Sequence, residues 1–222
     1  MYGIEPVRAR VPAVKIIPNV NEYMRKEFKL EPGYNSIGMI TVSIDDVGFT
    51  AVDEATKKAN VEVVYARSFY AGNAHASGPL SGEFIGILAG PDPAEVESGI
   101  KSALECIRND ACFYTADEKG EIAFFAHCIS RTGKYLSREN NIKEGQPLAY
   151  LIAPPIEAMF ALDAAIKAAD VRMTTFFGPP SETNFAGAQL TGDQSNCRAA
   201  CEAFARAIME VAQNPVDIRI DQ

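Results

Sequence analysis

An α+β fold made of two tandem copies of one domain is the structure that this sequence predicts, each copy forming an antiparallel sheet with its helices packed on one face. Three observations predict it. The chain has 222 residues, of which 47% are hydrophobic, and this is enough apolar material for the cores of two domains of about 100 residues each. The sequence also repeats itself, and both copies show the same order of strand-like and helix-like segments.

The repeat consists of two matched pairs of segments. Residues 51–61 align with residues 161–171, with six identities in eleven positions and an offset of 110 residues. Residues 82–92 align with residues 184–194 at an offset of 102, so the first copy carries eight extra residues between its matched segments. No linker rich in proline or serine separates the copies. We therefore expect a first domain at residues 1–112 and a second at residues 113–222.

Each copy shows patterns for a strand, a short helix, two further strands and a longer helix. The strands are rich in β-branched and other apolar residues, and the short helix is rich in alanine and lysine. The expected strands are 36–43, 61–67 and 84–89 in the first copy and 148–153, 171–177 and 186–191 in the second, with extra β material at 11–17 and 122–127. The expected short helices are 53–60 and 161–170.

The longer helix that closes each copy has recognisable start and stop signals. In the first copy Asp92 is placed to cap it, Pro93 suits its first turn, and Glu95 is placed to reach back to free amides. In the second copy an apolar stripe ends before Asn214-Pro215. Because helices in this number bury their apolar stripes only by packing together on a sheet, the pattern favours an α+β domain.

Charge and composition exclude several classes of function. Lys+Arg number 21 and Asp+Glu 29, a net charge of −8, and such a chain repels phosphate backbones, so we expect no nucleic-acid partner. The apolar runs are much shorter than the roughly 20 residues that cross a bilayer, so we expect no membrane partner. The five cysteines are an odd number in apolar contexts, which predicts core thiols in a reducing compartment.

Few residues of the chain are suited to catalysis. The sequence lacks the nucleotide-binding, nucleophile-elbow and zinc-protease motifs. It has two histidines, of which His127 lies in an apolar run that favours a structural role and His75 lies in a loop of small residues. We therefore expect no enzyme, no catalytic residue, no metal and no required cofactor.

The eight extra residues of the first copy fall in a loop at 68–79, which contains Gly72 and Gly78 and so permits unusual backbone conformations. An ordinary surface loop stays open as an interpretation. The second copy has a shorter and stiffer stretch, 177–185, at the equivalent place. In an oligomer these two loops would meet around a symmetry axis and line an opening.

Three acidic residues form a candidate binding site. Asp45 and Asp46 follow the end of an expected strand, and Glu83 precedes another. Carboxylates brought together in this way would bind an amine, and the alternative is a solvated acidic turn. Only the first copy has the site, since the matching positions of the second copy are Pro155, Ile156 and Phe185.

A further set of motifs is Asp53-Glu-Ala-Thr-Lys, Val61-Glu-Val-Val-Tyr65, Tyr70-Ala-Gly72, Ser130-Arg-Thr-Gly133, Ala153-Pro-Pro155 and Pro179-Pro-Ser-Glu-Thr-Asn184. Together they resemble the EutL family, shell proteins of the ethanolamine-utilisation bacterial microcompartment. The resemblance runs from about residue 5 to residue 215. It implies two tandem, circularly permuted microcompartment domains of ferredoxin-like architecture. It also implies a homotrimer that mimics a hexagonal tile and packs with other shell proteins into a lattice in the bacterial cytoplasm.

The resemblance implies roles for individual residues as well. Trimers of the family have a central pore that opens and closes as loops move, and smaller pores within each subunit. For the small, ethanolamine-binding pore the resemblance points to Asp45, Asp46, Glu83 and Phe113. For the loops of the central pore it points to Phe69, Tyr70, Asn73, Thr183, Asn184 and Phe185. Ethanolamine and cobalamin are then the expected ligands in transit.

Two other functions stay open at this stage. A soluble amine sensor or carrier would use the same acidic site without forming a lattice. An enzyme that used Asp45 and Glu83 as an acid/base pair would need a nucleophile, metal or cofactor pattern that the sequence lacks.

Overall fold

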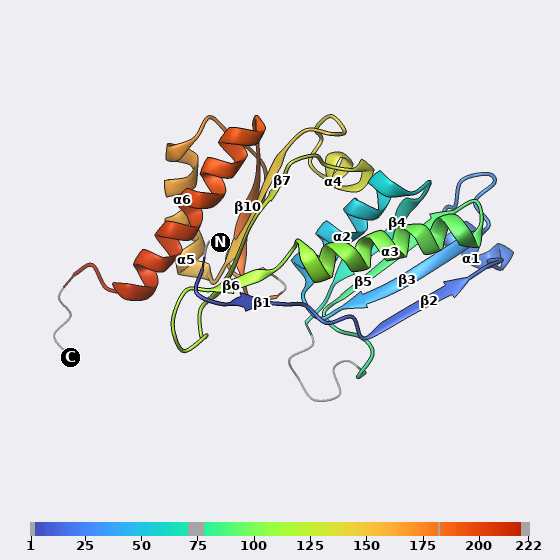
Figure 1. The fold of residues 1–222 in the computed structure, drawn as a ribbon, viewed down its shortest axis with the longest axis horizontal. Helices are drawn as coiled ribbons and strands as arrows, with labels where there is room; N and C mark the ends of the chain where they lie inside the picture. Colours follow the sequence, from blue (N-terminus) through green and yellow to red (C-terminus); the bar gives the residue numbers. More distant parts are fainter. Residues whose placement is uncertain (1–2, 71–77, 182, 219–222) are drawn as a thin grey trace. The chain divides into compact units, whose positions relative to one another are not determined.

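The computed structural model describes residues 3–70, 78–181 and 183–218, and it divides into two compact units. Unit 1 consists of residues 1–7, 112–131 and 146–222, and unit 2 of residues 8–111 and 132–145. Each unit has one antiparallel sheet with two long helices packed on one of its faces (Figure 1). This confirms the predicted α+β class.

Unit 2 has a four-stranded sheet in the order β2-β3-β5-β4. Its strands are β2 (Ala13–Ile17), β3 (Ser36–Val42), β4 (Glu62–Ser68) and β5 (Phe84–Gly90). Its helices are α1 (Glu22–Glu27), α2 (Asp45–Lys58), α3 (Pro93–Asn109) and α4 (Lys134–Glu139). Helices α2 and α3 pack on each other and on the sheet. A second apolar cluster, around Ile37 and Ile87, joins the sheet to Phe28 and Leu30 beside α1.

Unit 1 has a six-stranded sheet in the order β1-β6-β7-β8-β10-β9. Its strands are β1 (Pro6–Val7), β6 (Phe113–Thr115), β7 (Ala123–Ile129), β8 (Leu148–Ala153), β9 (Arg172–Phe177) and β10 (Ala186–Thr191). Its helices are α5 (Pro155–Ala168) and α6 (Gln194–Gln213), which share one apolar core with the sheet. The long helix α6 buries Cys197, Cys201, Phe204 and Ile208 on the expected face.

The two units share one topology, which supports the predicted duplication. In the order of the repeat, β7-β8-β10-β9 of unit 1 corresponds to β2-β3-β5-β4 of unit 2, and every pairing in both sheets is antiparallel. Helices α5 and α6 likewise correspond to α2 and α3, and α4 corresponds to α1. Strands β1 and β6 are additional and were not predicted.

Helices α2 and α5 begin earlier than predicted. We expected helices from residues 53 and 161, whereas α2 begins at Asp45 and α5 at Pro155. The glycine in the first turns of α2 hid its start, because Gly48 weakens helix propensity. Its presence has a packing reason: a Cβ there would lie 2.4 Å from the ring of Phe84.

The cap of α3 is confirmed in part. Asp92 accepts hydrogen bonds from the amides of Ala94 and Glu95, at 2.9 and 3.0 Å. Glu95 was expected to reach back to the free amides of its own helix. Its carboxylate instead accepts a 2.7 Å hydrogen bond from the amide of Asn60, which ties α3 to the end of α2.

The two compact units differ from the two sequence copies in two segments. The chain passes from unit 2 to unit 1 between Ala111 and Cys112, next to the expected boundary at 112/113. Residues 1–7, however, belong to unit 1, where β1 pairs with β6, and residues 132–145 belong to unit 2. The division into domains 1–112 and 113–222 stays a prediction about the sequence copies, and it differs from the compact units in these two segments.

A buried carboxylate holds segment 132–145 in unit 2. Asp53 on α2 is 1% exposed and accepts hydrogen bonds from the amides of Gly133 (2.7 Å) and Leu136 (2.8 Å) at the start of α4. Beside it, the Thr56 hydroxyl accepts a 3.0 Å hydrogen bond from the amide of Lys134. A Cβ on Gly133 would lie 2.3 Å from that hydroxyl oxygen. Residues of two sequence motifs that lie 80 positions apart therefore meet in one contact.

The cysteines lie where core thiols are expected. All five are free, and those at positions 106, 112, 197 and 201 are buried. Burial raises the pKa of Cys106 to about 12, so this thiol stays protonated. Within the described ranges, the helices are too short or too polar for a membrane span.

Replacing Asp53 is expected to destabilise the fold. In Asp53→Ala two buried amides lose their acceptor, which lowers the free energy of unfolding by about 3 kcal/mol. Urea unfolding followed by circular dichroism measures this. The control is Glu105→Ala on the exposed side of α3, which changes the free energy by less than about 0.5 kcal/mol. Equal stability of the two variants would contradict the role of Asp53.

Candidate functional site

The acidic cluster, defined as Asp45, Asp46 and Glu83, lies where β3, α2 and β5 meet in unit 2. Asp45 and Asp46 form the first turn of α2 and are only 8% and 7% exposed. Negative side chains are favoured in this position because the free amides of a helix start carry partial positive charge. The Asp45 carboxylate accepts a 3.0 Å hydrogen bond from the amide of Asp46. Glu83 is partly buried immediately before β5.

Two glycines place the backbone of Glu83 close to the end of β3 and the first turn of α2. Gly48 allows α2 to approach the ring of Phe84, the residue after Glu83. Gly82 has a φ of +64°, and a Cβ on it would lie 2.3 Å from the carbonyl oxygen of Val42. This close approach lets the amide of Glu83 donate a 2.8 Å hydrogen bond to the same carbonyl. The start of β5 is thereby placed against the end of β3 and the first turn of α2.

Electrostatics indicate that Asp45 and Glu83 interact. Burial, together with the neighbouring Glu83 carboxylate, raises the pKa of Asp45 to about 6, against the opposing effect of hydrogen bonds from the Asp46 amide and the Ser68 hydroxyl. Burial also raises the pKa of Glu83. Two desolvated carboxyl groups that repel each other are stabilised by a cation placed between them. The site is therefore chemically suited to an ammonium group.

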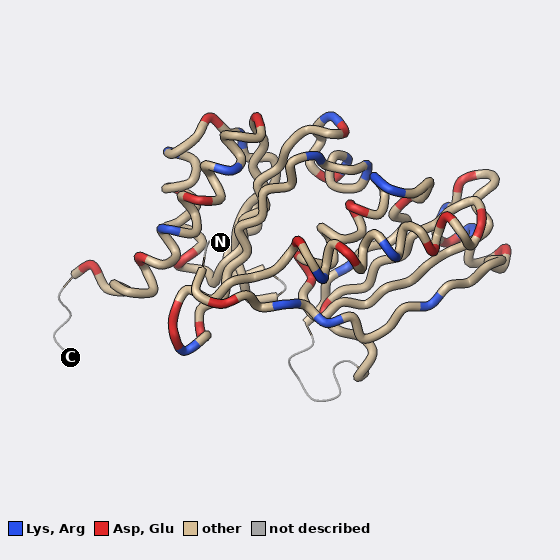
Figure 2. Tube along the Cα trace, viewed as in Figure 1, with Lys and Arg blue, Asp and Glu red and all other residues tan. Residues whose placement is uncertain are grey.

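Across residues 3–70, 78–181 and 183–218, no group of three or more His, Cys, Asp or Glu side chains is arranged to hold a metal ion. Acidic and basic residues are both scattered along the chain traces of the two units (Figure 2).

Phe113, the fourth residue expected at this site, belongs to unit 1. It lies in β6, is 5% exposed and stacks on Phe125 with 5.1 Å between ring centroids. The ring of Phe185 contacts it edge-on at 6.1 Å. The structure thus places all three acidic residues in unit 2, where Asp45 and Glu83 interact, and it places Phe113 in the aromatic core of unit 1.

The base of the first-copy loop adjoins the acidic cluster. Phe69, which follows β4, donates a 3.0 Å backbone hydrogen bond to the carbonyl of Glu83, so the two ends of the loop are joined next to the acidic residues. Tyr70 is 56% exposed. Asn73 and His75 lie outside the described residues.

The second-copy loop makes a tight turn in unit 1. The amide of Ser181 donates to the carbonyl of Phe185 at 2.7 Å, and the amide of Asn184 donates to the carbonyl of Ser181 at 3.0 Å. Asn184 has a φ of +67°, a left-handed conformation that asparagine tolerates better than most residues. The Ser181 and Thr183 hydroxyls are 3.4 Å apart. The aromatic Phe185 occupies the repeat position of Glu83, as the sequence alignment predicts.

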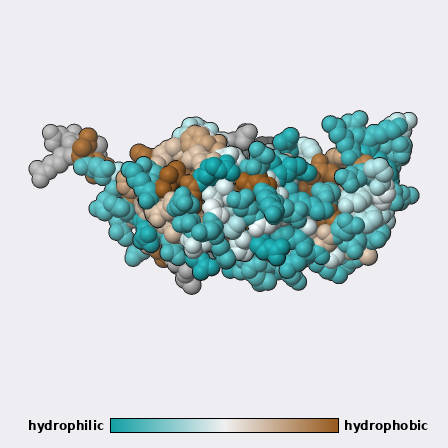
Figure 3. Space-filling model, turned by 90° about the horizontal axis from the view of Figure 1, so that it is seen from above, coloured by the Kyte–Doolittle hydropathy of each residue, from teal (hydrophilic) through white to brown (hydrophobic). Residues whose placement is uncertain are grey.

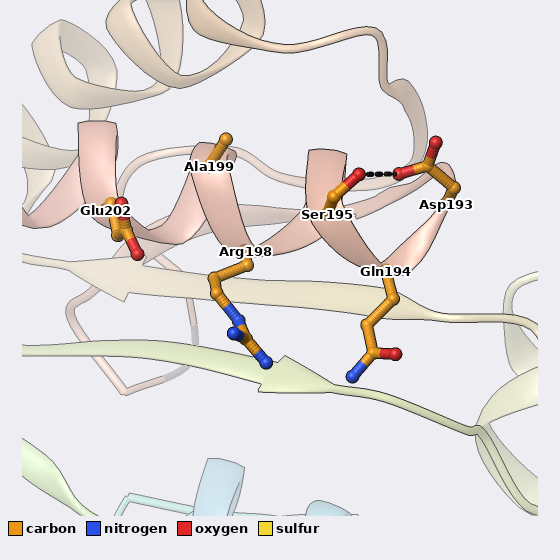
Figure 4. A pocket seen from close by; sticks show the side chains of 6 residues that line it. All are labelled: Asp193, Gln194, Ser195, Arg198, Ala199 and Glu202. Atoms are coloured by element: carbon orange, nitrogen blue, oxygen red, sulfur yellow. Dashed lines mark hydrogen bonds between the residues drawn. The ribbon is translucent and has the colours of Figure 1, made fainter.

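A shallow groove lies beside α6 in unit 1. It has a volume of about 570 Å³ and is lined by Asp193, Gln194, Ser195, Arg198, Ala199 and Glu202. Figure 4 shows Gln194 and Arg198 extending from the helix toward the strands, whereas Ser195 turns toward Asp193, to which it donates a 2.7 Å hydrogen bond. Asp193 also caps α6 through the amide of Asn196. The groove is therefore lined by the capping residue of α6 and by residues of its first turns.

Some residues of the site were not recognised in the sequence. The Ser68 hydroxyl at the end of β4 hydrogen-bonds Asp45 at the start of α2, and Gly48 matters only through its approach to Phe84. No local pattern marks either contact. The glycine before Glu83 was a usable signal, because a glycine directly ahead of a strand indicates an unusual backbone turn. The other candidate, His127, lies in β7 with its ring stacked 5.3 Å from that of Phe125, as expected for a structural histidine.

Comparisons with known proteins agree with this architecture. Residues 36–116 match the BMC domain family. The chain is 59% identical over 210 residues to the bacterial microcompartment shell protein EutL of Clostridium perfringens, a match that covers 95% of this chain and 97% of that protein. Its structure resembles the crystal structure of the ethanolamine utilization protein EutL from Leptotrichia buccalis, with a TM-score of 0.93, 57% identity and coverage of 97% and 100%.

A more distant likeness extends the comparison of the fold. The crystal structure of PduB, described as a trimeric bacterial microcompartment shell protein, has a TM-score of 0.74 and 20% identity and covers 90% of this chain and 88% of that one. At this identity the match shows the shared fold alone.

The raised pKa of Asp45 makes stability depend on pH. Between its ordinary value of 3.8 and about 6 the folded protein holds a proton that the unfolded chain releases, so the free energy of unfolding falls as pH rises through this window. The difference corresponds to about 3 kcal/mol. Asp45→Asn removes this dependence, so the variant is more stable than the wild type at pH 7.5 and similar to it at pH 4. Urea unfolding at both pH values measures the effect, and equal differences at the two values would contradict it.

Proposed function

Because the chain belongs to the EutL family of bacterial microcompartment shell proteins, we propose that it assembles as a trimeric tile whose acidic cluster binds ethanolamine. Its relatives are structural shell proteins, so the chain is a structural component of a microcompartment shell and not an enzyme. The ligand and the state of assembly are the parts that we propose. The relative from Leptotrichia buccalis is described as an ethanolamine utilization protein, which directs attention to a small amine.

The observation that carries the ligand proposal is the proximity of Asp45 and Glu83. Their carboxyl groups are desolvated and interact with each other, so the charged form of each is disfavoured until a cation arrives. Ethanolamine carries an ammonium group at neutral pH, which matches two carboxylates. Its hydroxyl group needs a polar partner of its own. The repeat position in unit 1 has Pro155, Ile156 and Phe185 in place of the acidic residues, so each chain binds one ethanolamine.

The trimer proposal follows from the duplication. Three chains with two similar units each supply six units, the number that a hexagonal tile requires. PduB, which shares the fold, is described as trimeric. Tiles of this kind pack edge to edge with other shell proteins in a lattice. The tile requires no cofactor of its own, and both ethanolamine and cobalamin are ligands in transit.

A gated central pore completes the proposal. Its lining would come from Phe69, Tyr70, Asn73, Thr183, Asn184 and Phe185. Cobalamin is bulky and needs a wide opening. Retention of the aldehyde that is formed from ethanolamine inside the compartment needs a closed one. A ligand shifts such an equilibrium only if it binds one state better. The backbone hydrogen bond between Phe69 and Glu83 supports a coupling in which ethanolamine favours the closed state. Equal ethanolamine affinity of variants locked open and locked closed would exclude this coupling.

A soluble amine sensor or carrier is the second candidate, since the acidic cluster alone would serve it. Such a protein forms no lattice. Electron microscopy of the concentrated protein distinguishes the two, because a shell protein forms extended sheets and a carrier does not.

Glu83→Gln is expected to weaken ethanolamine binding by about tenfold or more, because it replaces a charge-assisted contact with a neutral one. Calorimetric titration of the purified trimer measures the affinity. The matched control is Glu97→Gln, an exposed glutamate that pairs with Lys101 on α3, and it keeps the wild-type affinity. Binding that is unchanged in Glu83→Gln would place the ligand elsewhere and leave the shell function intact.

The affinity for ethanolamine is expected to depend on pH. The ammonium needs ionised carboxylates, and the pKa of Asp45 is about 6 in the free protein. Affinity should therefore be constant above about pH 7 and fall about tenfold for each pH unit below 6. Titrations at pH 5, 6, 7 and 8 measure this profile. In Asp45→Asn the affinity is lower and the dependence on pH is weaker, whereas an affinity that rises on acidification would contradict the proposed role of the carboxylates.

A further inference from the structure

The packing of helix α4 on α2 and β4 has a counterpart in the repeat. The equivalent elements are α1 on one side and α5 with β9 on the other, and their equivalent apolar side chains are exposed in the single chain. In unit 2, helix α4 packs on α2 and β4. Besides the amides held by Asp53, the ring of Tyr135 lies parallel to that of Phe49 with 6.3 Å between centroids. Lys134 Nζ lies 2.6 Å from a carboxylate oxygen of Glu62. Tyr135 and Leu136 are 8% and 2% exposed as a result.

The repeat supplies the same elements a second time. Helix α1 stands at the position of α4, and α5 with β9 stands at the position of α2 with β4. At the offset of 112 residues that relates 36–42 to 148–154, the residues equivalent to Tyr135 and Leu136 are Tyr23 and Met24. These are 80% and 37% exposed. The side that α4 buries is therefore apolar in α1 too, although it is largely open to solvent in the single chain.

The receiving surface shows the same contrast. At the offset of 110 residues, Thr50 and Thr56 of α2 correspond to Phe160 and Ile166 of α5. The threonines are 4% and 6% exposed, whereas Phe160 and Ile166 are 45% and 40% exposed. Helix α5 thus has large, exposed apolar side chains where α2 has small, buried polar ones. Ile156 at the start of α5 is also 71% exposed. Such a concentration of apolar side chains on one helix marks a protein interface.

Hydrophobic groups of this kind are exceptions on the surface. The face shown in Figure 3 is mostly hydrophilic, with brown hydrophobic residues in a few separate groups. Met173 and Phe176 on β9, next to α5 in the repeat arrangement, are 37% and 54% exposed.

Charge complementarity identifies the occupant. The ion pair Lys134–Glu62 corresponds, position by position, to Glu22 on α1 and Arg172 on β9. Both charges are reversed, so the pair stays complementary. Glu22 and Arg172 are exposed in the single chain. A reversal at both positions together is the pattern expected of two groups that meet.

We propose that α1 of one copy of this chain packs on α5 and β9 of a second copy, and that Glu22 and Arg172 form the ion pair of this interface. The contact repeats between chains what α4 does on α2 and β4 within the chain. Each chain offers α1 at one site and α5 at another, so the interface joins copies head to tail, an arrangement that forms a ring when the rotation between neighbouring copies closes. That the ring holds three chains rests on the proposed function.

The test compares the masses of wild-type and variant chains by analytical ultracentrifugation over a range of concentrations. Arg172→Glu places two like charges at the interface and is expected to raise the dissociation constant of the trimer at least tenfold, as is Glu22→Arg. The double variant, which exchanges the two charges, restores the trimer. The control is Lys101→Glu, a charge reversal on exposed α3, which leaves the mass unchanged.

A second variant tests the apolar part of the interface. Phe160→Asp is expected to produce a folded monomer, because Phe160 is exposed in the single chain; circular dichroism verifies the fold. A wild-type trimer that none of these substitutions weakens would overturn the proposed interface and leave the shell function standing. A wild-type chain that stays monomeric at all concentrations would overturn both proposals.

Discussion

The buried carboxylate of Asp53 is the interaction on which the arrangement of this chain depends. It is 1% exposed and receives two amides from the start of α4, a helix that is too short to be stable by itself. Burial raises the pKa of Asp53, while the hydrogen bonds from Gly133 and Leu136 oppose this effect. A buried carboxylate without these donors would be very costly, so the acid and the helix start require each other. The result is that residues 132–145 belong to unit 2, although the strands before and after them belong to unit 1.

Duplication followed by divergence explains why the two units share one topology but differ in the residues at the start of one helix. Both units use the same strand order and the same pair of long helices, and these parts supply the cores. The differences lie at the junction of the first repeat strand with its helix. There unit 2 has Asp45 and Asp46, which suit the positive start of a helix, and unit 1 has Pro155, which suits its first turn. Both sequences suit the start of a helix, and only the acidic one also supplies carboxylates for the proposed amine site.

The acidic cluster and the base of the loop beside it show how one local backbone turn positions a candidate binding residue. Gly82 takes a left-handed backbone conformation and approaches the carbonyl of Val42, and this puts Glu83 next to Asp45. The backbone carbonyl of Glu83 also accepts a hydrogen bond from the amide of Phe69, at the other end of the loop. A ligand that neutralises the repulsion between two carboxylates would therefore act directly at the point where the loop begins and ends. The proposed coupling between ligand and loop therefore requires no pathway of residues through the rest of the molecule.

The sequence by itself determined the α+β class, the duplication and the resemblance to a family, because these depend on periodicity and on motifs that are local in the chain. It also identified Asp45, Asp46 and Glu83 as candidates. The strands at 148–153 and 186–191 were placed with the bounds that the structure has, since their apolar runs have clear ends. The tertiary structure alone decided that Asp53 and Gly133 meet, that α2 begins at Asp45, and that residues 132–145 belong to unit 2. Each of these depends on contacts between residues far apart in sequence, where burial and close approach outweigh local propensity.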